Sequence, residues 1–288
     1  MDDVSCPDFV KQPDCVFVFD ANAFLHRAMH VCYADRAPTI APTDAAFVKH
    51  AGKMIANVLH ALNVRQMVVA LDSTEHSFRC DWYPAYKAQR KPHTPVFAAQ
   101  APRFFDALRR AGVMVVGEAR YEADDVIASM VMARRDFPVC IISSDKDLLQ
   151  HVGSDVVMYD AMKDVFMDAR AAEEKFGVCP DQIADYLGLV GDPGDGIPGV
   201  PSVGAKTAAK LLRKFGTLDA MYAVHRDLAT ALSAKQFATV MEHQETALLS
   251  RRLAQPTIWS ECPKLTCETD GLRAPEPIHI RRVTEALG

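Results

Sequence analysis

The sequence predicts an α/β fold, with a mostly parallel central sheet flanked by helices and a C-terminal part that is helical. Over the first two-thirds of the chain, short apolar runs rich in β-branched residues alternate with amphipathic segments, as in a doubly wound sheet. From about residue 180 the strand-like runs stop and several short helical patterns follow. The composition, 49% hydrophobic and 24% charged over 288 residues, excludes collagen-like, coiled-coil and disordered chains.

Four apolar runs mark the expected strands, at residues 15–19, 67–71, 113–116 and 139–142. Each has only four or five residues, which favours buried strands of a parallel sheet. Residues 43–62 carry apolar side chains largely on one helical face, so we expect a helix there. We expect a Gly/Pro-rich turn region at 191–204 and helical structure throughout 219–252, whereas the Pro-rich tail from residue 255 is ambiguous.

The chain shows no feature of a membrane or secreted protein. No apolar run approaches the roughly 20 residues that span a bilayer, and the acidic start lacks an apolar signal segment. The eight cysteines are scattered without CxxC pairs: Cys6, Cys15, Cys32, Cys80, Cys140, Cys179, Cys262 and Cys267. We therefore expect free thiols in a reducing cytoplasm. We also expect a monomer, because the sequence leaves no long apolar surface stripe.

Acidic residues follow each predicted strand and return in the turn region. The four strands lead to Asp20, to Asp72, to Glu122, Asp124 and Asp125, and to Asp145 and Asp147, while Asp192 and Asp195 lie in the turn region. Because ligands of open parallel sheets bind beyond the carboxyl ends of the strands, these nine acids are expected to form one pocket. The net charge is −5, so the chain without these nine acids is mildly basic and could approach phosphates.

Each acid has a structural interpretation when it is taken alone, as a helix cap or a first-turn residue. Nine like charges in one crevice, however, require cations to neutralise them. Oxygen ligands without histidine or cysteine select Mg²⁺ or Mn²⁺, and the excess of acids suggests two ions. Two ions of this kind cleave phosphodiesters, so metal-assisted phosphate ester hydrolysis is the predicted reaction class.

Two basic segments accompany the acids. Residues 78–91 combine four cations with three aromatic residues, which suits single-stranded nucleic acid, although a solvated connection would look similar. If residues 83–90 are helical, four side chains share a face: Tyr83, Tyr86, Lys87 and Arg90. Residues 197–216 have a Gly-containing turn before a helix with Lys206, Lys210, Arg213 and Lys214, which is typical of a helix–hairpin–helix that holds backbone phosphates.

Taken together, these motifs resemble the 5′-nuclease superfamily of flap endonucleases and 5′–3′ exonucleases, most closely the 5′-nuclease domain of bacterial DNA polymerase I. The resemblance covers nearly the whole chain. It rests on VFVFD at 16–20, FLHRAMH at 24–30, FR at 78–79, YKAQR at 86–90, YEADD at 121–125, SDKD at 144–147 and GDPGDGIPGVPSVGAKTA at 191–208. It implies a PIN-like core over residues 1–180 with a helical arch at about 73–100, and a helical part over 181–288.

The resemblance also implies a Mg²⁺-dependent two-metal nuclease that acts on DNA with 5′ flaps, 5′ ends or junctions, with Mn²⁺ able to substitute. Asp20, Asp72, Glu122 and Asp124 would serve one metal, Asp145, Asp147, Asp192 and Asp195 the other, and Asp125 would support them. Lys87 and Arg90 would contact the scissile phosphate, with Arg27, Arg79 and Tyr86 as further DNA contacts. The hairpin with Gly199, Val200, Val203, Gly204 and Lys206 would bind duplex DNA and hold a K⁺ ion.

The chain departs from the family at His26, where a tyrosine is usual, and within the turn 192–196, where both acids are kept. Since the sequence stops at Gly288 without a polymerase segment, we expect a free-standing nuclease in replication or repair. The alternatives are a PIN-like RNase, which usually lacks the hairpin motif, and a non-catalytic DNA-junction binding protein, which would not need the complete acid set. An aspartyl phosphatase is disfavoured because Asp20 is followed by Ala21 and Asn22.

Overall fold

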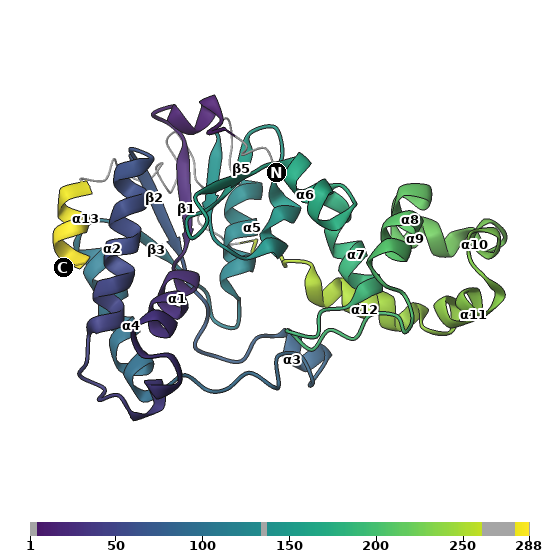
Figure 1. The fold of residues 1–288 in the computed structure, drawn as a ribbon, viewed down its shortest axis with the longest axis horizontal. Helices are drawn as coiled ribbons and strands as arrows, with labels where there is room; N and C mark the ends of the chain where they lie inside the picture. The colour runs from purple at the N-terminus through teal and green to yellow at the C-terminus, as the bar shows by residue number, and fades with distance from the viewer. Residues whose placement is uncertain (1–4, 134–136, 261–279, 288) are drawn as a thin grey trace.

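One six-stranded sheet forms the centre of the N-terminal part. The strands are β1 (Val16–Asp20), β2 (Gln66–Ala70), β3 (Met114–Val116), β4 (Val139–Ile142), β5 (Val156–Asp160) and β6 (Val165–Met167). Their order is β3-β2-β1-β4-β5-β6, and all neighbours are parallel except β5 and β6. The computed structural model describes residues 5–133, 137–260 and 280–287 (Figure 1).

Helices cover both faces of this sheet because successive strand residues point to opposite sides. One face, with Phe17, Phe19 and Met67, packs against α1 (Ala21–Tyr33), α2 (Ala46–Ala61), α4 (Pro95–Arg110) and α13 (Ile280–Leu287). The other face, with Val16 and Val18, packs against α5 (Ala123–Ala133) and α6 (Ala169–Phe176). Figure 1 shows these two layers on either side of the strands.

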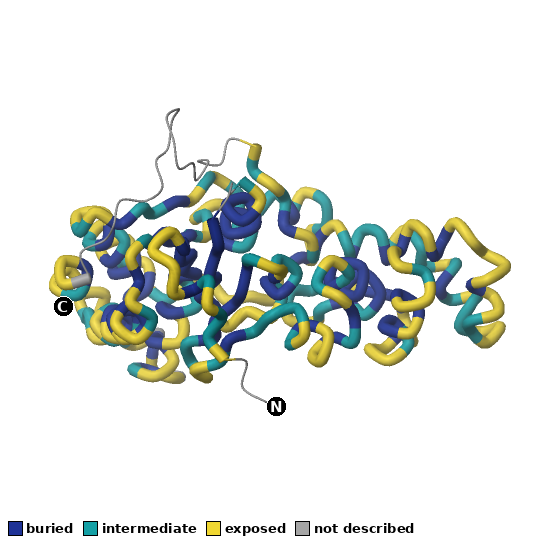
Figure 2. The backbone as a smooth tube through the Cα atoms, turned by 90° about the horizontal axis from the view of Figure 1, so that it is seen from above, coloured by how far each residue is buried: buried dark blue, intermediate teal, exposed yellow. Residues whose placement is uncertain are grey.

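The C-terminal part is a set of short helices that extends from one side of the sheet layer (Figure 1). Its helices are α7 (Ile183–Val190), α8 (Ala205–Phe215), α9 (Leu218–Ala223), α10 (His225–Ala231), α11 (Ala234–Glu242) and α12 (Gln244–Ala254). Buried residues of α7, α8 and α12 belong to the same hydrophobic cluster as one face of the sheet. Buried residues are therefore found without interruption from the sheet layer into the helical part (Figure 2).

Short elements connect these layers. The 3₁₀ helices are η1 (Asp8–Lys11), η2 (Ala34–Thr39), η3 (Lys146–His151) and η4 (Pro180–Gln182), and the short helix α3 (Arg79–Trp82) follows β2. Residues 83–90 form turns after α3, so the helical face expected for Tyr83, Tyr86, Lys87 and Arg90 is absent from this segment. Lys87 itself has a positive φ of 51°, which a regular helix does not allow.

The predicted fold class is confirmed, and the four predicted strands lie within one residue of the observed ones. The sequence interpretation missed β5 and β6, and it merged α9 to α12 into one helical stretch. The break before α11 has a local cause: Ser233 accepts a hydrogen bond from the Gln236 backbone N–H at 3.3 Å and caps a new helix. Part of the ambiguous tail, residues 261–279, lies outside the described residues.

Other expectations can be compared directly with the described residues. No helix in the described part of the chain is long and apolar enough to cross a membrane. Six cysteines in that part are free thiols, as expected: Cys6, Cys15, Cys32, Cys80, Cys140 and Cys179. Cys262 and Cys267 lie outside the described residues.

Gly199 is one of the glycines that the turn between α7 and α8 requires. Gly199 has φ +64°, and a Cβ atom there would lie 2.4 Å from the Gly191 nitrogen. We expect Gly199→Ala to lower the free energy of unfolding by about 2–4 kcal/mol in a urea titration, because backbone cannot move aside. Gly204→Ala is the matched control, since no atom lies within 4 Å of its added Cβ; equal losses for both variants would contradict this explanation.

Candidate active site

The first acids of the site lie where the strand order reverses. The chain runs outward from β1 through β2 to β3 and, on the other side, from β4 to β5. Asp20 is the last residue of β1, and Asp145 follows β4 by three residues. Asp20 accepts hydrogen bonds from the Ala23 N–H at 3.1 Å and from the Ser143 hydroxyl at 2.8 Å. It therefore caps α1 and faces the loop after β4, in the crevice that such sheets use for ligands.

The second strand contributes Asp72, whose carboxylate bridges two neighbouring elements. Its Oδ1 accepts a hydrogen bond from the Ala123 N–H at 2.7 Å, at the start of α5. Its other oxygen accepts one from the side chain of Asn22, in the first turn of α1. These two contacts bring the ends of β1 and β2 and the start of α5, which carries Asp124, to the same place.

Repulsion between neighbouring carboxylates raises the pKa values of several of these acids, and the charge of Asp145 acts on both Asp124 and Asp147. Burial raises the pKa of Asp124 well above its usual value, and the charges of Asp145, Asp20 and Asp72 add to this although Lys87 opposes it. Burial, followed by the Asp72 charge, also raises the pKa of Asp20 to about 6. In a second group of acids, burial and then the Asp145 charge raise the pKa of Asp147 to about 7, with smaller effects from Asp192 and Asp195.

The buried, mutually repelling carboxylates are suitable ligands for cations, although their side chains do not surround a single point in this structure. No group of three or more His, Cys, Asp or Glu side chains in residues 5–133, 137–260 and 280–287 is arranged to hold a metal as it stands. Asp147 Oδ1, however, is buried without a hydrogen-bond partner. A carboxylate oxygen in this state is costly unless a proton or a cation meets it. The all-oxygen donor set therefore fits a hard divalent ion in each group.

Two cationic side chains and one tyrosine hydroxyl contact the carboxylate of Glu122. It accepts hydrogen bonds from Lys87 Nζ at 2.6 Å, the Tyr86 hydroxyl at 2.8 Å and Arg79 Nη1 at 3.1 Å. Burial alone would raise the pKa of Glu122, but Lys87 and Arg79 outweigh burial and hold it below the usual value. Glu122 is thus the contact between the acid cluster and the basic segment after α3.

Lys87 and Arg90 lie against the acidic turn 192–195. Lys87 Nζ is 3.5 Å from Asp195 Oδ2, and the Lys87 backbone N–H donates to the Asp195 carbonyl at 2.8 Å. Arg90 forms an ion pair with Asp195 at 2.5 Å. Gln89 also donates to the carbonyls of Pro193 and Gly194, at 3.1 and 2.9 Å. The basic segment and the second acid group are therefore in direct contact.

Three residues expected at the site are buried in a structural network. Arg79 is 2% exposed and forms a two-pronged ion pair with Asp125, which is 0% exposed, at 2.6 and 2.8 Å. Tyr86 is 4% exposed, and its hydroxyl donates a hydrogen bond to Glu122. Arg79 is paired with Asp125, and Tyr86 donates to Glu122 while it also lines the pocket that contains Lys87 and Arg90. The DNA contacts expected for Arg79 and Tyr86 and the supporting role expected for Asp125 stay predictions.

The hairpin between α7 and α8 presents its backbone and lysines outward while its valines face inward. Val200 and Val203 are 3% and 6% exposed, and the Gly199 N–H donates to the Ser250 hydroxyl of α12 at 3.0 Å. Gly204 begins α8 as its N-cap, and Lys206 is exposed in its first turn. Arg27 is exposed on α1. Of these, Gly204, Lys206 and Arg27 remain available to a ligand, and the valines hold the hairpin in place.

A pocket of about 1130 Å³ lies beside the site and includes residues that sequence reasoning missed. Asp72, Lys87, Arg90 and Glu122 line it together with His26 and His93. The rings of His26 and His93 stack on Phe97, with centroid distances of 4.9 and 4.4 Å. The sequence around His93 gave no sign of a role at the site. Its partners, His26 of α1 and Phe97 of α4, come together only in the folded chain.

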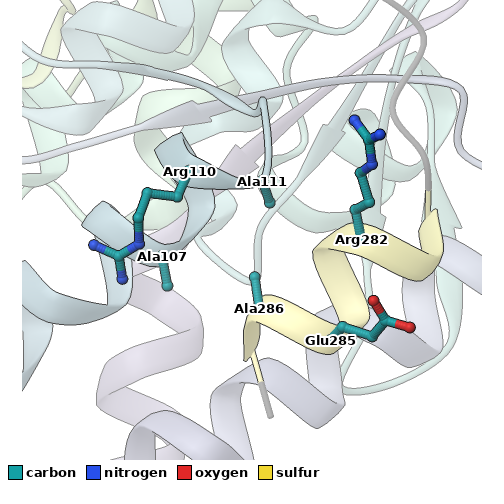
Figure 3. A pocket seen from close by; sticks show the side chains of 6 residues that line it. All are labelled: Ala107, Arg110, Ala111, Arg282, Glu285 and Ala286. Carbon is teal, nitrogen blue, oxygen red and sulfur yellow. The ribbon is translucent and has the colours of Figure 1, made fainter.

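A second pocket, of about 260 Å³, lies between α4 and α13 (Figure 3). Its two arginines, Arg110 and Arg282, point away from each other, and the remaining lining includes three alanines (Figure 3). A pocket without converging polar groups has no means to orient a substrate. The pocket with Lys87 and the acids is the better candidate for an active site.

The raised pKa of Asp147 leads to a pH-dependent prediction for the metal-free protein. Its carboxyl binds a proton more tightly in the folded state, so its contribution to stability is lost as the pH rises from about 4 to about 7. After solvent screening is allowed for, Asp147→Asn should raise the Tm in EDTA at pH 7.5 by about 2–6 °C, equivalent to about 1–2 kcal/mol.

The advantage of Asp147→Asn should fade at pH 5.5, where Asp147 is protonated in the wild type, and saturating Mg²⁺ should reverse it at pH 7.5. Comparison with the wild type at each pH cancels other titrations, such as that of His151, whose pKa burial lowers to about 4. Differential scanning calorimetry measures the effect. A destabilised variant in EDTA at pH 7.5 would contradict the assignment.

Comparisons with known proteins agree with this architecture. Two family profiles match: "5'-3' exonuclease, N-terminal resolvase-like domain" over residues 15–177 and "5'-3' exonuclease, C-terminal SAM fold" over residues 178–277. A 5'-3' exonuclease from Aquifex aeolicus is 32% identical over 206 residues, which cover 71% of each chain. DNA polymerase I from Bacillus caldotenax is 36% identical over 208 residues, which cover 70% of this chain and 23% of the polymerase.

Solved structures show the same fold at lower identity. A mutant T5 5'-exonuclease superposes with a TM-score of 0.66 at 20% identity and covers 83% of this chain and 87% of its own. A bacteriophage T5 flap endonuclease solved as a pseudo-enzyme–product complex with DNA and metal ions gives 0.63 at 19% identity, over 83% and 88%. The chain spans about a quarter of the length of the matched polymerases, 23% in the Bacillus protein. On the family profiles and the Aquifex relative, the chain belongs to the 5'-3' exonuclease family.

Proposed function

We propose that the protein is a structure-specific 5′ nuclease that hydrolyses DNA phosphodiesters with two divalent ions, Mg²⁺ by preference, at 5′ flaps, 5′ ends or junctions. The observation that carries the proposal is the cluster of acids beyond β1, β2 and β4, which Lys87 contacts through Glu122 and Asp195. Asp20, Asp72 and Asp124 would hold one ion with Asp145 nearby. Asp147, Asp192 and Asp195 would hold the other. We place the reaction in DNA replication or repair in the cytoplasm, by a monomer.

The bound ions would lower the pKa of an attacking water and neutralise the leaving oxygen. Lys87 and Arg90 would bind the oxygens of the scissile phosphate, where fixed positive charge stabilises the transition state most effectively. Both side chains are now paired with acids, Lys87 with Glu122 and Arg90 with Asp195. Glu122 would keep the Lys87 ammonium at the edge of the acid cluster until a phosphate arrives.

The helical part would hold the duplex beside the nuclease core. Gly204 has no side chain to cap the first amides of α8, and Lys206 and Lys210 are exposed on the same helix. Helix N-termini and lysines of this kind bind backbone phosphates without reading sequence. The hairpin carbonyls offer a place for a K⁺ ion, which would strengthen the phosphate contact.

Removal of the exposed lysines should weaken DNA binding without slowing the chemistry. For Lys206→Ala combined with Lys210→Ala, we expect a higher KM and a slope of log Kd against log salt that is smaller by about 1–2, because up to two phosphate contacts are lost. Fluorescence anisotropy over a salt series measures the slope. An unchanged slope, or a fall in kcat at saturating DNA, would contradict this role.

Two other functions predict different results. A non-catalytic DNA-junction binding protein would have no reason to keep Lys87 within 2.6 Å of Glu122 beside coupled acids. A PIN-like RNase would use the same acids but would prefer an RNA strand. The sequence match to two exonuclease domains favours the DNA nuclease over both.

A panel of 5′-end-labelled substrates of identical sequence tests the proposed function. It contains a flapped DNA duplex, a nicked duplex, single-stranded DNA and a flapped duplex whose 5′ arm is RNA, each with Mg²⁺ or EDTA. We expect Mg²⁺-dependent cleavage near the junction of the flapped DNA and slower cleavage of the single strand. Binding without product would identify a junction-binding protein, and preferred cleavage within the RNA arm would identify an RNase.

A further inference from the structure

Arg79 satisfies all five of its N–H donors inside the protein. Nε donates to the Leu253 carbonyl at 2.9 Å, and Nη2 donates to the Gln255 carbonyl at 3.1 Å. The remaining bonds go to Asp125 at 2.8 and 2.6 Å and to Glu122 Oε2 at 3.1 Å. A guanidinium has five donors in a rigid fork, so this arrangement fixes its position completely.

The carbonyl partners of Arg79 belong to a segment, residues 253–259, that runs from the end of α12 along α5. Further along this segment, the Thr257 N–H donates to Asp125 at 2.6 Å and the Trp259 N–H donates to the Ser129 hydroxyl at 2.8 Å. Asp125 and Ser129 are one turn apart on α5, and the Ser129 hydroxyl also donates to the Asp125 carbonyl at 2.6 Å. The helical part is thereby joined to α5 through buried polar contacts.

The same network ends at Glu122. Arg79 and the Tyr86 hydroxyl both donate to Glu122 Oε2, at 3.1 and 2.8 Å, which leaves Oε1 for Lys87 at 2.6 Å. The Glu122 backbone N–H donates to Asp125 at 3.0 Å. Glu122 is therefore fixed through one carboxylate oxygen and its backbone, and its second oxygen orients Lys87.

We propose that Arg79 and Tyr86 are positioning residues: they hold Glu122 Oε2 so that Glu122 presents Lys87 to the reacting phosphate. They act from inside the protein and do not touch DNA. Arg79 also donates hydrogen bonds to the carbonyls of Leu253 and Gln255. It therefore connects the end of α12 to Glu122 and Lys87. The inference rests on the proposed nuclease function and adds two residues to its machinery.

A purely structural network would give a different result from a positioning network. Loss of a buried ion pair destabilises a protein, but it leaves the turnover of the folded molecules unchanged. Displacement of a reacting group by about 1 Å can cost about 100-fold in rate. The test therefore uses variants that keep the fold and separates kcat from KM.

Arg79→Lys keeps the charge opposite Asp125 but has only three donors for five acceptors. Tyr86→Phe removes only the hydroxyl and is the second variant should Arg79→Lys fail to fold. Ser129→Ala is the matched control, because it loosens residues 253–259 without touching Glu122. Circular dichroism and Tm establish folding, and Trp259 fluorescence in a Trp82→Phe background reports the contact of this segment with α5.

On a flapped DNA duplex with Mg²⁺, we expect kcat to fall about 10- to 100-fold for Arg79→Lys and about 3- to 10-fold for Tyr86→Phe, with KM within about twofold. Ser129→Ala should keep kcat within about twofold of the wild type. Combined with Glu122→Gln, either positioning variant should be no slower than Glu122→Gln alone, because both act through Glu122.

Wild-type kcat in folded Arg79→Lys and Tyr86→Phe would overturn the inference, and so would fully additive losses with Glu122→Gln. A rise in KM with unchanged kcat would also overturn it and would restore Arg79 and Tyr86 as DNA contacts. A wild-type protein that cuts no flapped DNA would instead refute the proposed function, on which the inference rests.

Discussion

Asp145→Asn should lower the single-turnover rate of metal-dependent cleavage by at least about 10³-fold. The charge of Asp145 raises the pKa of both Asp124 and Asp147, so Asp145 acts on both groups of acids. An asparagine of the same shape removes a charge from both groups at once. Each ion would then be held less tightly, and the charge that develops on the phosphate would be less well neutralised. Quench-flow measurement on a labelled flapped duplex gives the rate.

This loss of rate should not come from unfolding. Asp145→Asn removes a like charge from a crowded site, so the metal-free variant should melt at or above the wild-type temperature at pH 7.5. Asp181→Asn is the matched control, because Asp181 is an exposed acid in η4, outside the nine site acids. A rate within about tenfold of the wild type for Asp145→Asn would remove Asp145 from the metal site.

Lys87→Ala should lower kcat by about 10²- to 10³-fold while Kd for flapped DNA changes by only a few-fold. The Lys87 side chain is 17% exposed, and its ammonium lies 2.6 Å from one oxygen of Glu122, so it is held at the edge of the acid cluster. Burial would lower the pKa of Lys87, but the charges of Glu122 and the other acids raise it above the usual value. In the proposed reaction, the side chain would therefore act as a permanent positive charge and not as a base.

Lys91→Ala is the matched control for Lys87→Ala, because Lys91 lines the same pocket and is exposed. It should change Kd modestly through long-range charge and leave kcat unchanged. Isothermal titration with uncleaved substrate in Ca²⁺ gives Kd, and single-turnover kinetics give the rate. Equal effects of the two substitutions on kcat would mean that Lys87 supplies only general positive charge.

Much of the fold could be predicted because its signals are local. A buried parallel strand needs a continuous apolar run, and all four runs that were identified became β1 to β4. β5 has such a run as well, Val156-Val-Met-Tyr, but β6 has only three residues and pairs antiparallel at the sheet edge. Asp20 ends β1 and Asp145 follows β4, which is a neighbouring parallel strand, although the sequence analysis predicted no strand order.

The roles of individual side chains could be predicted less well, because they depend on contacts distant in sequence. Arg79 was expected to contact DNA, and nothing in the sequence indicated that its partners Leu253 and Gln255 come from a segment more than 170 residues away. Asp125 looked like one acid among nine until the fold placed Arg79 beside it. Residues 83–90 have a helical spacing, but the contacts of Lys87 and Gln89 with residues 193–195 hold them in turns.

The central claim is that the acid cluster works by holding divalent ions. It is tested most directly by single-turnover cleavage of a 5′-end-labelled flapped duplex as the Mg²⁺ concentration is varied, for wild type and Asp145→Asn. We predict no cleavage in EDTA, a wild-type rate that rises more steeply than the first power of Mg²⁺ at limiting metal, and a much weaker response in the variant. Cleavage in EDTA, or the same metal response in both proteins, would contradict the claim.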